Sequence, residues 1–327
     1  MNNININLNK YKNCCLCPRA CDVDRLAGGA SSVDFGFCRE SSQLRLAFAG
    51  LHRGEEPPLS GKGGSGTIFV SGCNLGCAFC QNRQISQEGM GRAVLTEEFA
   101  VICMELQNKG AENINIVTGS HAVPAIVMGL CAAKNTGLRI PVLWNSSGYE
   151  SPETLKLLDG LIDIWLPDLK TLDSALAAGF FNAPGYPQAA VSAIMWMIRN
   201  RPRHVIIRHL ILPGHLESTR AVLRWFADYA AGRASLSLMS QYTPVTKAGG
   251  YGRLELSGGT KPPERYLARQ EYETVLGWLG EFGIEDGFCQ EFVTGSDWLP
   301  DFNRSNPFSS ELSVPVWHFR DAQKCRK

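Results

Sequence analysis

The sequence predicts an α/β fold in which parallel strands are joined by crossover helices. Two observations carry this prediction: six short apolar runs of strand character occur along the chain, and helix-like segments alternate with them. The 327 residues, 44% of them apolar, also suffice for a large buried core. Such units form either a barrel or an open doubly wound sheet. In both, ligands bind at the carboxyl ends of the strands.

The elements are expected in regular order. We expect strands at residues 67–70, 114–118, 142–145, 162–166, 205–212 and 236–242. We expect helices at residues 96–110, 124–134, 152–158, 189–198, 218–231 and 264–282. Thr96 is expected to cap the first helix because its hydroxyl can accept a backbone hydrogen bond, and Gly110 is expected to end it.

Composition divides the chain into three parts. Residues 1–45 are rich in cysteine and poor in large apolar residues, so we expect a small segment folded around a metal. Residues 46–300 hold the strand–helix units and the entry segment that precedes them. Within this entry segment, residues 54–66 are rich in Gly and Pro and are expected to form a loop. Residues 301–327 are less regular, and we expect a tail that wraps the body.

The charge balance indicates no nucleic-acid or membrane partner. The formal net charge is +1, and the charged residues are spread along the chain. The polar N-terminus has no apolar stretch of the kind a secretory signal needs, so we expect a cytoplasmic protein. In that reducing compartment the 12 cysteines are not expected to form disulfides, and their clustering indicates metal ligation.

Three cysteines directly after the first expected strand form a candidate cluster site. Cys73, Cys77 and Cys80 have the spacing C-x3-C-x2-C. Each thiolate can hold one iron of a cubane, which leaves the fourth iron without a cysteine and open to a substrate. The alternatives are a zinc loop or unrelated thiols, but zinc sites usually use paired C-x2-C units and four ligands.

This loop resembles the motif of the radical SAM superfamily, C-x3-C-x-aromatic-C after a first strand, with Phe79 at the aromatic position. The resemblance implies a [4Fe-4S] cluster on Cys73, Cys77 and Cys80 whose open iron chelates S-adenosylmethionine (SAM). One electron would split SAM into methionine and a 5′-deoxyadenosyl radical, which abstracts a hydrogen atom from the substrate. Phe79 would lie near the adenine.

Further motifs resemble one subgroup, the pyruvate formate-lyase activating enzyme-like proteins of the PflX type. The matching segments are Cys14-x2-Cys17-Pro-Arg-x-Cys21, Arg25, Gly36-x-Cys38, Gly54-Glu-Glu-Pro57, Gly64-Ser-Gly-Thr67 and Cys80-Gln-Asn82. This resemblance implies a partial (β/α)6 TIM-like barrel of the radical SAM type. It also implies activation of a glycyl-radical protein by hydrogen abstraction, with an electron donor such as flavodoxin or ferredoxin.

One segment departs from the superfamily pattern. Many members carry a Gly-Gly-Glu-type segment after the second strand, where this chain has Thr118, Gly119, Ser120 and His121. Backbone carbonyls near Thr118 and Gly119, with the Ser120 hydroxyl, could accept hydrogen bonds from the methionine amino group. His121 could face the cavity instead.

Polar residues after the third and fourth strands are further candidates. Asn145, with Ser146 and Ser147, could bind the ribose or the methionine carboxylate, although a plain turn explains these residues equally well. Asp168 and Lys170 resemble the Asp-x-Lys of activating enzymes and are expected on the substrate side of the cavity, a surface ion pair being the alternative.

An apolar strand contains two adjacent polar residues, Arg208 and His209, which must face opposite sides. Arg208 could clamp the carboxylate of SAM, because a guanidinium matches carboxylate geometry. His209 is expected to be a satisfied structural histidine, and His215 has no assigned role. Gln290 and Glu291 fit the subgroup's C-terminal pattern without a known mechanism.

The remaining cysteines divide into two groups. Cys14, Cys17, Cys21 and Cys38, with Cys15 spare, could close a structural zinc site or hold a second iron–sulfur cluster. The scattered ones are expected to be inert. Cys103, Cys131 and Cys289 are expected to be small buried hydrophobic residues, and Cys325 a free thiol in the tail.

Other functions stay open at this point. A radical enzyme of this kind could instead modify another peptide, an RNA base or a metabolite. A non-catalytic electron-transfer protein or cluster carrier would need no open iron and no SAM.

Overall fold

The parallel sheet is built from two sets of strands. The computed structural model describes residues 8–26, 35–245 and 261–321. In the first set, β2 (Ser65–Val70), β4 (Ile114–Val117), β5 (Val142–Ser146) and β6 (Ile164–Pro167) pair in parallel in that order. In the second set, β7 (Ile206–Leu210), β8 (Ser235–Met239) and β9 (Gly287–Cys289) do the same.

The two sets form one partial barrel. Parallel bridges from Trp165 to Val205 and from Asp168 to Arg208 connect β6 to β7. The described strands do not close on themselves, because β9 ends one side and antiparallel strands end the other. The predicted α/β fold with a partial (β/α)6 barrel is therefore confirmed, and the parallel order brings the carboxyl ends of β2 and of β4 to β8 to one side of the sheet.

Antiparallel strands that the sequence analysis missed extend the other edge. β1 (Arg45–His52) pairs with β2, with β10 (Ser313–His318) and with the short β3 (Arg92–Ala93). The C-terminal tail thus adds a strand to the main sheet. Pro315 lies within β10, which is compatible with its position at the sheet edge.

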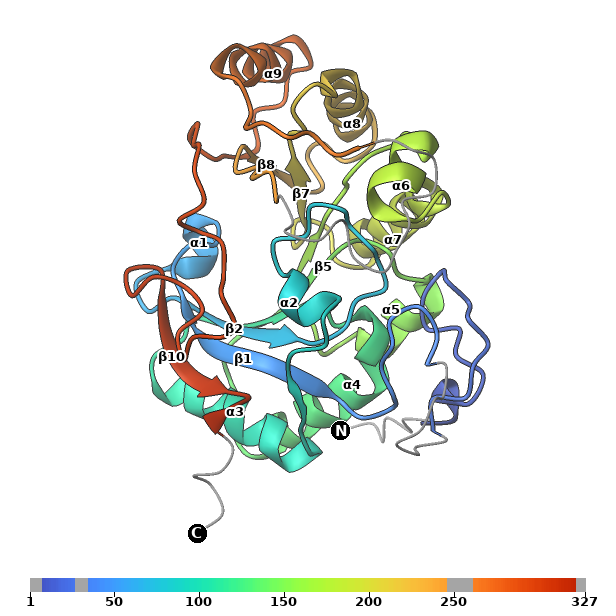
Figure 1. The fold of residues 1–327 in the computed structure, drawn as a ribbon, viewed down its shortest axis with the longest axis vertical. Helices are drawn as coiled ribbons and strands as arrows, with labels where there is room; N and C mark the ends of the chain where they lie inside the picture. The colour runs from blue at the N-terminus through green and yellow to red at the C-terminus, as the bar shows by residue number, and fades with distance from the viewer. Residues whose placement is uncertain (1–7, 27–34, 246–260, 322–327) are drawn as a thin grey trace.

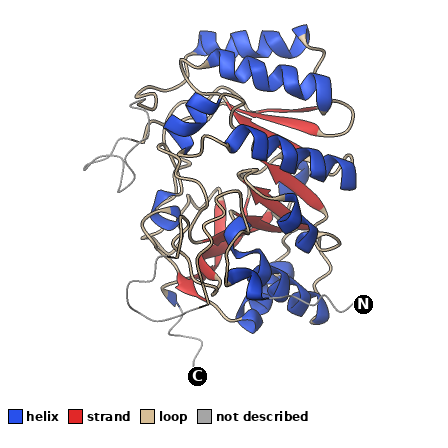
Figure 2. Cartoon of the chain, turned by 90° about the vertical axis from the view of Figure 1, so that its right-hand side faces the viewer, coloured by secondary structure: helices blue, strands red, loops and turns tan. Residues whose placement is uncertain are grey.

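Long helices cover the outer side of the strands (Figures 1 and 2). They are α3 (Thr96–Asn108), α4 (Val123–Asn135), α5 (Pro152–Leu158), α6 (Ser174–Phe181), α7 (Tyr186–Asn200), α8 (Leu216–Tyr229) and α9 (Arg269–Glu281). Short ones are η1 (Leu8–Tyr11), α1 (Pro57–Ser60), α2 (Arg83–Ser86) and η2 (Ser120–Ala122). Among the described helices, none is long and apolar enough to cross a membrane.

Three local predictions were wrong. Leu95 precedes the first turn of α3 without a side-chain cap, so Thr96 is a helical residue rather than the cap. The segment predicted as loop at 54–66 contains α1 and the start of β2. Helix α6 was missed, although Asp173 caps it by accepting hydrogen bonds from the backbone N–H groups of Ala175 (2.7 Å) and Leu176 (3.1 Å).

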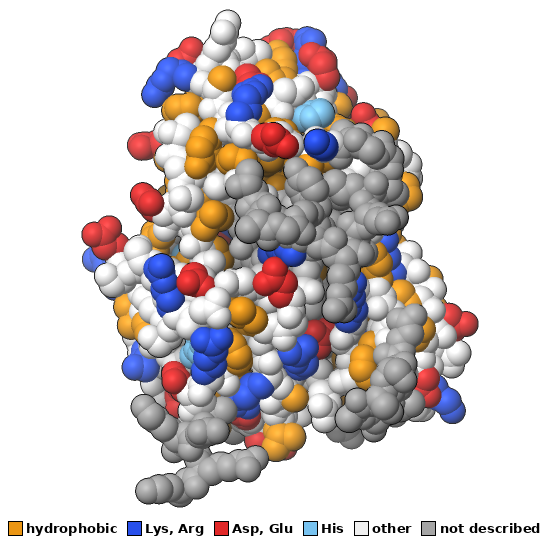
Figure 3. Space-filling view, in the orientation of Figure 1, with side chains coloured by type: hydrophobic (Ala, Val, Ile, Leu, Met, Phe, Trp, Pro, Cys, Tyr) orange, Lys and Arg blue, Asp and Glu red, His pale blue; other side chains and the backbone are white. Residues whose placement is uncertain are grey.

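The core lies between the strands and the helices. Its large members include Phe99, Trp144 and Trp165, all fully buried. A smaller aromatic cluster of Phe48, Phe69 and Phe302 attaches the C-terminal tail to β1 and β2. The face in Figure 3 shows acidic and basic side chains interspersed, in agreement with the balanced charge.

Candidate functional site

A cavity of about 600 Å³ lies at the carboxyl ends of the parallel strands. Its size is in the range of small-molecule and cofactor sites. Residues that follow β2, β4, β5 and β6 line it together with residues of β7 and those after β8. Its wall includes Cys73, Cys77, Phe79, Cys80, Thr118, Asn145, Ser146, Ser147, Asp168, Lys170, Arg208, Gln241 and Gln290.

Cys73, Cys77 and Cys80 share this cavity, in the loop between β2 and α2. The loop is held against the end of α6, because the backbone N–H groups of Gly76 and Ala78 donate to the carbonyls of Phe181 (3.1 Å) and Phe180 (2.8 Å). The arrangement therefore rests on backbone bonds as well as on any bound group.

The donor set fits a [4Fe-4S] cluster. Burial raises the pKa of Cys77 to about 12, and burial also raises the pKa values of Cys73 and Cys80. Such thiols ionise when a bound metal supplies positive charge. Two already have hydrogen-bond partners, since Leu75 N–H lies 3.3 Å from Cys73 Sγ and Ser86 Oγ lies 3.3 Å from Cys80 Sγ. Three cysteines in the cavity wall leave one iron of a cubane open.

Phe79 forms part of the apolar wall. Its ring contacts Phe181 and Tyr242 edge to face, with centroid distances of 5.8 and 5.2 Å. It lies at the cavity surface beside the cysteines, which is compatible with the expected neighbourhood of an adenine.

The segment after β4 divides between the cavity and the core. Thr118 lines the cavity with φ of 63°, a left-handed conformation that threonine rarely adopts. Gly119 lies behind it: an added Cβ would come within 2.7 Å of the Trp144 ring. Ser120 is buried and donates to Glu150 Oε1 over 2.5 Å. Of the three residues expected to hold the methionine amino group, Thr118 is at the cavity wall and Ser120 is engaged elsewhere.

His121 faces the N-terminal segment rather than the main cavity. Its Nε2 lies 2.8 Å from the carbonyl of Ser71, and its own carbonyl accepts a hydrogen bond from Arg25 (2.8 Å). Burial and the charge of Arg25 lower the pKa of His121 to about 3, so the ring is neutral. The expectation that it faces the cavity is wrong.

Asp168 and Lys170 face the cavity as expected. Their side chains are joined by an ion pair of 2.5 Å and are each about one-fifth exposed, which excludes the alternative of a surface pair. Burial lowers the pKa of Lys170, but Asp168 and Cys77 outweigh this effect and raise it, so the amine is a cation. The cavity therefore has a positive charge beside its cysteines.

Tyr186, which the sequence analysis missed, fixes this pair from behind. Its hydroxyl accepts a hydrogen bond from the backbone N–H of Lys170 (3.0 Å) and lies 2.8 Å from the carbonyl of Asp168. It also lies 2.9 Å from the carbonyl of Ser147. The fully buried ring thus connects the ends of β5 and β6. No motif in the sequence marks this residue, because it belongs to the first turn of α7.

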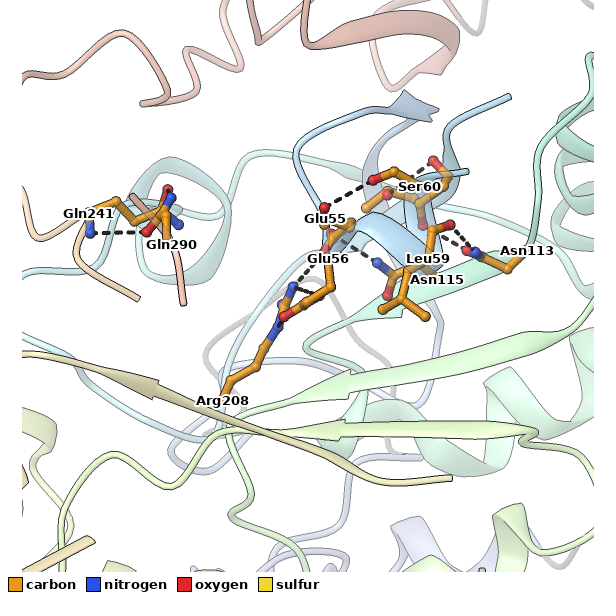
Figure 4. A network of polar contacts seen from close by, with 11 residues as sticks. Glu55, Glu56, Leu59, Ser60, Asn113, Asn115, Arg208, Gln241 and Gln290 are labelled. Carbon is orange, nitrogen blue, oxygen red and sulfur yellow. Dashed lines mark hydrogen bonds and ion pairs between the residues drawn. The ribbon is translucent and has the colours of Figure 1, made fainter. Parts of the chain in front are cut away.

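Arg208 points from β7 to two carboxylates (Figure 4). Its Nε and Nη2 each lie 2.7 Å from the carboxylate of Glu56, and Nη2 also contacts Glu55. Glu55 in turn accepts a hydrogen bond from Asn115 (2.9 Å). With Nε and Nη2 engaged by acidic groups of the chain itself, this geometry does not support the expected clamp on the SAM carboxylate. The clamp would require the pair to break.

His209 has the structural role expected of it. Its Nδ1 lies 2.7 Å from the carbonyl of Leu169 and its Nε2 3.0 Å from Thr219 Oγ1. Burial lowers the pKa of His209 to about 4. His215 lies against the ring of Phe180, with a centroid distance of 5.1 Å, outside the main cavity.

Two glutamines, Gln241 after β8 and Gln290 after β9, form a further part of the wall (Figure 4). Gln290 accepts hydrogen bonds from the backbone N–H groups of Ser240 (3.0 Å) and Gln241 (3.2 Å). Its amide also donates to the side chain of Gln241 over 2.9 Å. Gln241 was missed by the sequence analysis, and Glu291 contributes its backbone carbonyl to Ser240 Oγ (2.6 Å).

The remaining described cysteines lie outside this cavity. Cys103 is buried as predicted and Cys131 is half-buried, but Cys289 is exposed because β9 is an edge strand, so its predicted burial is wrong. Cys325 lies outside the described residues. The second metal expected on the N-terminal cysteines stays a prediction.

A match to a protein-family model agrees with this site. The model of the radical SAM superfamily matches residues 67–226. The uncharacterized protein MJ0674 of Methanocaldococcus jannaschii is 31% identical over 290 residues, which cover 86% of this chain and 78% of the relative.

Solved structures with some similarity include proteins from Streptococcus suis and Sphaerobacter thermophilus. SuiB of Streptococcus suis bound to the precursor peptide SuiA has a TM-score of 0.49 and 17% identity, over 67% of this chain and 46% of SuiB. A radical SAM methyltransferase from Sphaerobacter thermophilus has a TM-score of 0.47 and 15% identity, over 72% of this chain and 67% of that one. This chain spans less than half the length of SuiB.

The matched range begins in β2 and contains the cysteine loop, Asp168, Lys170 and about half of the residues of the cavity wall. The geometry and the sequence matches therefore concern the same residues. Members of the superfamily use a [4Fe-4S] cluster and SAM, for which Cys73, Cys77 and Cys80 supply a fitting donor set. The chain belongs to the radical SAM superfamily and is a radical SAM enzyme.

Proposed function

We propose that this enzyme abstracts a hydrogen atom from a glycine of a partner protein and so activates a glycyl-radical enzyme. The motif resemblance to activating enzymes suggests this reaction. The observation that carries it is the far wall of the cavity, where the amides of Gln241 and Gln290 form an uncharged, hydrogen-bonded pair. Such a wall suits the backbone of a peptide loop, which presents N–H and C=O groups and no charge.

The wall of the cavity that holds the cysteines, opposite the two glutamines, would bind the cofactors. A bound cluster would supply the electron that cleaves SAM into methionine and a 5′-deoxyadenosyl radical. Cys73, Cys77 and Cys80 would hold the cluster. Thr118 and Asn145, at the ends of neighbouring strands β4 and β5, would orient the methionine part, since they line the same wall.

Ser147 is a further contact for the ribose. Its hydroxyl oxygen is buried and has no hydrogen-bond partner among the described residues, although the residue lines the cavity. An unpaired buried hydroxyl is costly, so a bound polar group would satisfy it. Phe79 would cover the adenine from its apolar side.

Asp168 and Lys170 would separate the cofactor from the substrate. Lys170 is a fixed cation beside Cys77 and balances the negative charge of metal-bound thiolates. Asp168 holds the amine in place, and Tyr186 holds the backbone of both. A rigid pair of this kind also keeps water from the reacting atoms. A low-potential donor such as flavodoxin or ferredoxin would supply the electron.

Labelled glycine tests this proposal. The anaerobically reconstituted enzyme would be incubated with SAM, dithionite and the protein extract of its own host grown on [2,2-²H₂]glycine. We expect deuterium in the 5′-deoxyadenosine that forms, measured by mass spectrometry, and a protein-based glycyl radical by EPR.

An extract labelled instead with deuterated alanine is the control, and its 5′-deoxyadenosine should remain unlabelled. Steady formation of deuterium-free 5′-deoxyadenosine with the glycine-labelled extract, without a protein radical, would contradict glycine as the target. It would favour a different peptide position, an RNA base or a metabolite.

A further inference from the structure

A second, narrow cavity lies in the N-terminal segment, and four cysteines line it. They are Cys14, Cys17, Cys21 and Cys38, joined by Asn74 of the cluster loop. Backbone hydrogen bonds shape the segment around them, including Cys14 N–H to the carbonyl of Val23 (3.1 Å). Thr154 of α5 fixes it to the barrel by donating to the carbonyl of Leu16 (2.6 Å). Cys15, between two of these cysteines, is exposed and does not take part.

A buried cation, Arg25, lines this cavity beside the cysteines and over the ring of Tyr11. The side chain is 1% exposed, and its hydrogen bonds go to the carbonyls of Glu40 (2.6 Å), Ser41 (2.9 Å) and His121 (2.8 Å) and to Cys14 Sγ (3.4 Å). The carbonyls are neutral, and the carboxylate of Glu40 pairs with Arg45 instead. A buried cation is costly unless it is paired.

Of the hydrogen-bonding partners of Arg25, Cys14 Sγ is the one that would be negative as a metal ligand, because cysteine binds metals as a thiolate. A second sulfur, Cys21 Sγ, accepts a hydrogen bond from the backbone N–H of Phe37 (3.4 Å). Hydrogen bonds to thiolate sulfur are one of the features that tune iron–sulfur sites.

The four cysteines surround a narrow recess and are not grouped around one point. Among the described residues, no three His, Cys, Asp or Glu side chains are placed to hold a single metal ion. Around a tetrahedral zinc ion the sulfur atoms lie about 2.3 Å from the metal and leave almost no space between them. In a cubane each cysteine binds a different iron, so the sulfurs stand apart around the inorganic core.

We propose that Cys14, Cys17, Cys21 and Cys38 hold a second [4Fe-4S] cluster, complete in cysteine ligands. The position of this second cluster relative to the first follows from the residues that lie between the two sites. Asn74 lines the second cavity and directly follows Cys73 of the first, and its carbonyl accepts a hydrogen bond from Arg19 (3.0 Å). Cys38 and Cys73 also line one common recess between the two sites. The two clusters are therefore neighbours, and their electron spins couple when both are reduced.

The metal content of a variant without the first site tests this proposal independently of any radical chemistry. Substitution C73A/C77A/C80A removes the first cluster and leaves the N-terminal cysteines intact. After anaerobic reconstitution we expect about four iron and four sulfide ions per chain. We also expect an EPR signal after reduction that SAM does not change, because this cluster has no open iron.

Complementary variants start from the native chain, for which about eight iron ions are expected. Substitution C17A/C21A should lower the content to about four, while the remaining cluster still changes its EPR signal on addition of SAM, which shows that the barrel is folded. Substitution C15A, the matched control, should keep about eight. An iron-free C73A/C77A/C80A protein, with zinc or with no metal, would overturn the proposal.

Discussion

Replacing Cys77 with alanine is expected to abolish the cleavage of SAM and to remove about four iron ions per chain. Cys77 is one of three cysteines that line the main cavity, and no other described residue of that wall is a cysteine. Without it a cubane would have two protein ligands and two open irons. Iron analysis and chromatographic measurement of 5′-deoxyadenosine would follow both effects.

Cys131 provides the matched control. It is a half-buried cysteine on α4, away from both cavities. Its replacement with alanine should leave iron content and SAM cleavage unchanged, so that a general effect of losing a thiol is excluded. A Cys77→Ala protein with full iron content and normal cleavage would contradict the assignment of the cluster ligands.

Replacing Arg208 with alanine is expected to reduce the free energy of unfolding by about 3–5 kcal/mol at neutral pH. The guanidinium contacts both Glu55 and Glu56, and the side chains of all three are at most 13% exposed. The variant would leave two carboxylates buried without their cation. Urea titration at several pH values would measure the change.

The expected pH dependence follows from Glu56. Burial raises its pKa, but Arg208 outweighs burial and holds the pKa below its usual value. In the native chain this pair adds stability above the unfolded pKa of about 4.3, and the contribution is lost as the pH falls. In the variant the hydrogen bonds of Glu56 to Ser237 and to a backbone N–H remain, but without Arg208 burial favours the protonated carboxyl more than it does in the native chain. The difference between the two proteins should therefore shrink below about pH 5.

Arg220 is the control for a simple loss of charge. It pairs with Glu281 over 3.2 Å on the surface, where both side chains are more than 40% exposed. Its replacement with alanine should cost about 1 kcal/mol or less. Equal effects of the two substitutions would show that the Arg208 pair is not a buried structural element.

Much of this molecule could be predicted from the sequence because the signals were local. Strands of four to six apolar residues and a tight cysteine spacing need no knowledge of distant contacts. Pairing across the chain was harder to anticipate. β1 and β10 are more than 250 residues apart, and β10 contains a proline that argues against a strand unless it lies at a sheet edge.

In the candidate site, too, local signals could be predicted from the sequence and contacts between distant residues could not. Asp168 and Lys170 were placed correctly because strand ends point to the site. The role of Arg208 could not be foreseen, since its partners Glu55 and Glu56 lie some 150 residues earlier, in a segment expected to be loop. Ser120 and His121 also turned away from the cavity, because a short helical turn follows Gly119.

Reduction of the purified, reconstituted enzyme in the presence of SAM is a direct test of the assigned radical chemistry. Under anaerobic conditions with dithionite, we expect 5′-deoxyadenosine and methionine in equal amounts, together with a change in the EPR signal of the reduced cluster when SAM is added. An intact, reduced cluster on Cys73, Cys77 and Cys80 that leaves SAM uncleaved, with an unchanged EPR signal, would contradict that assignment.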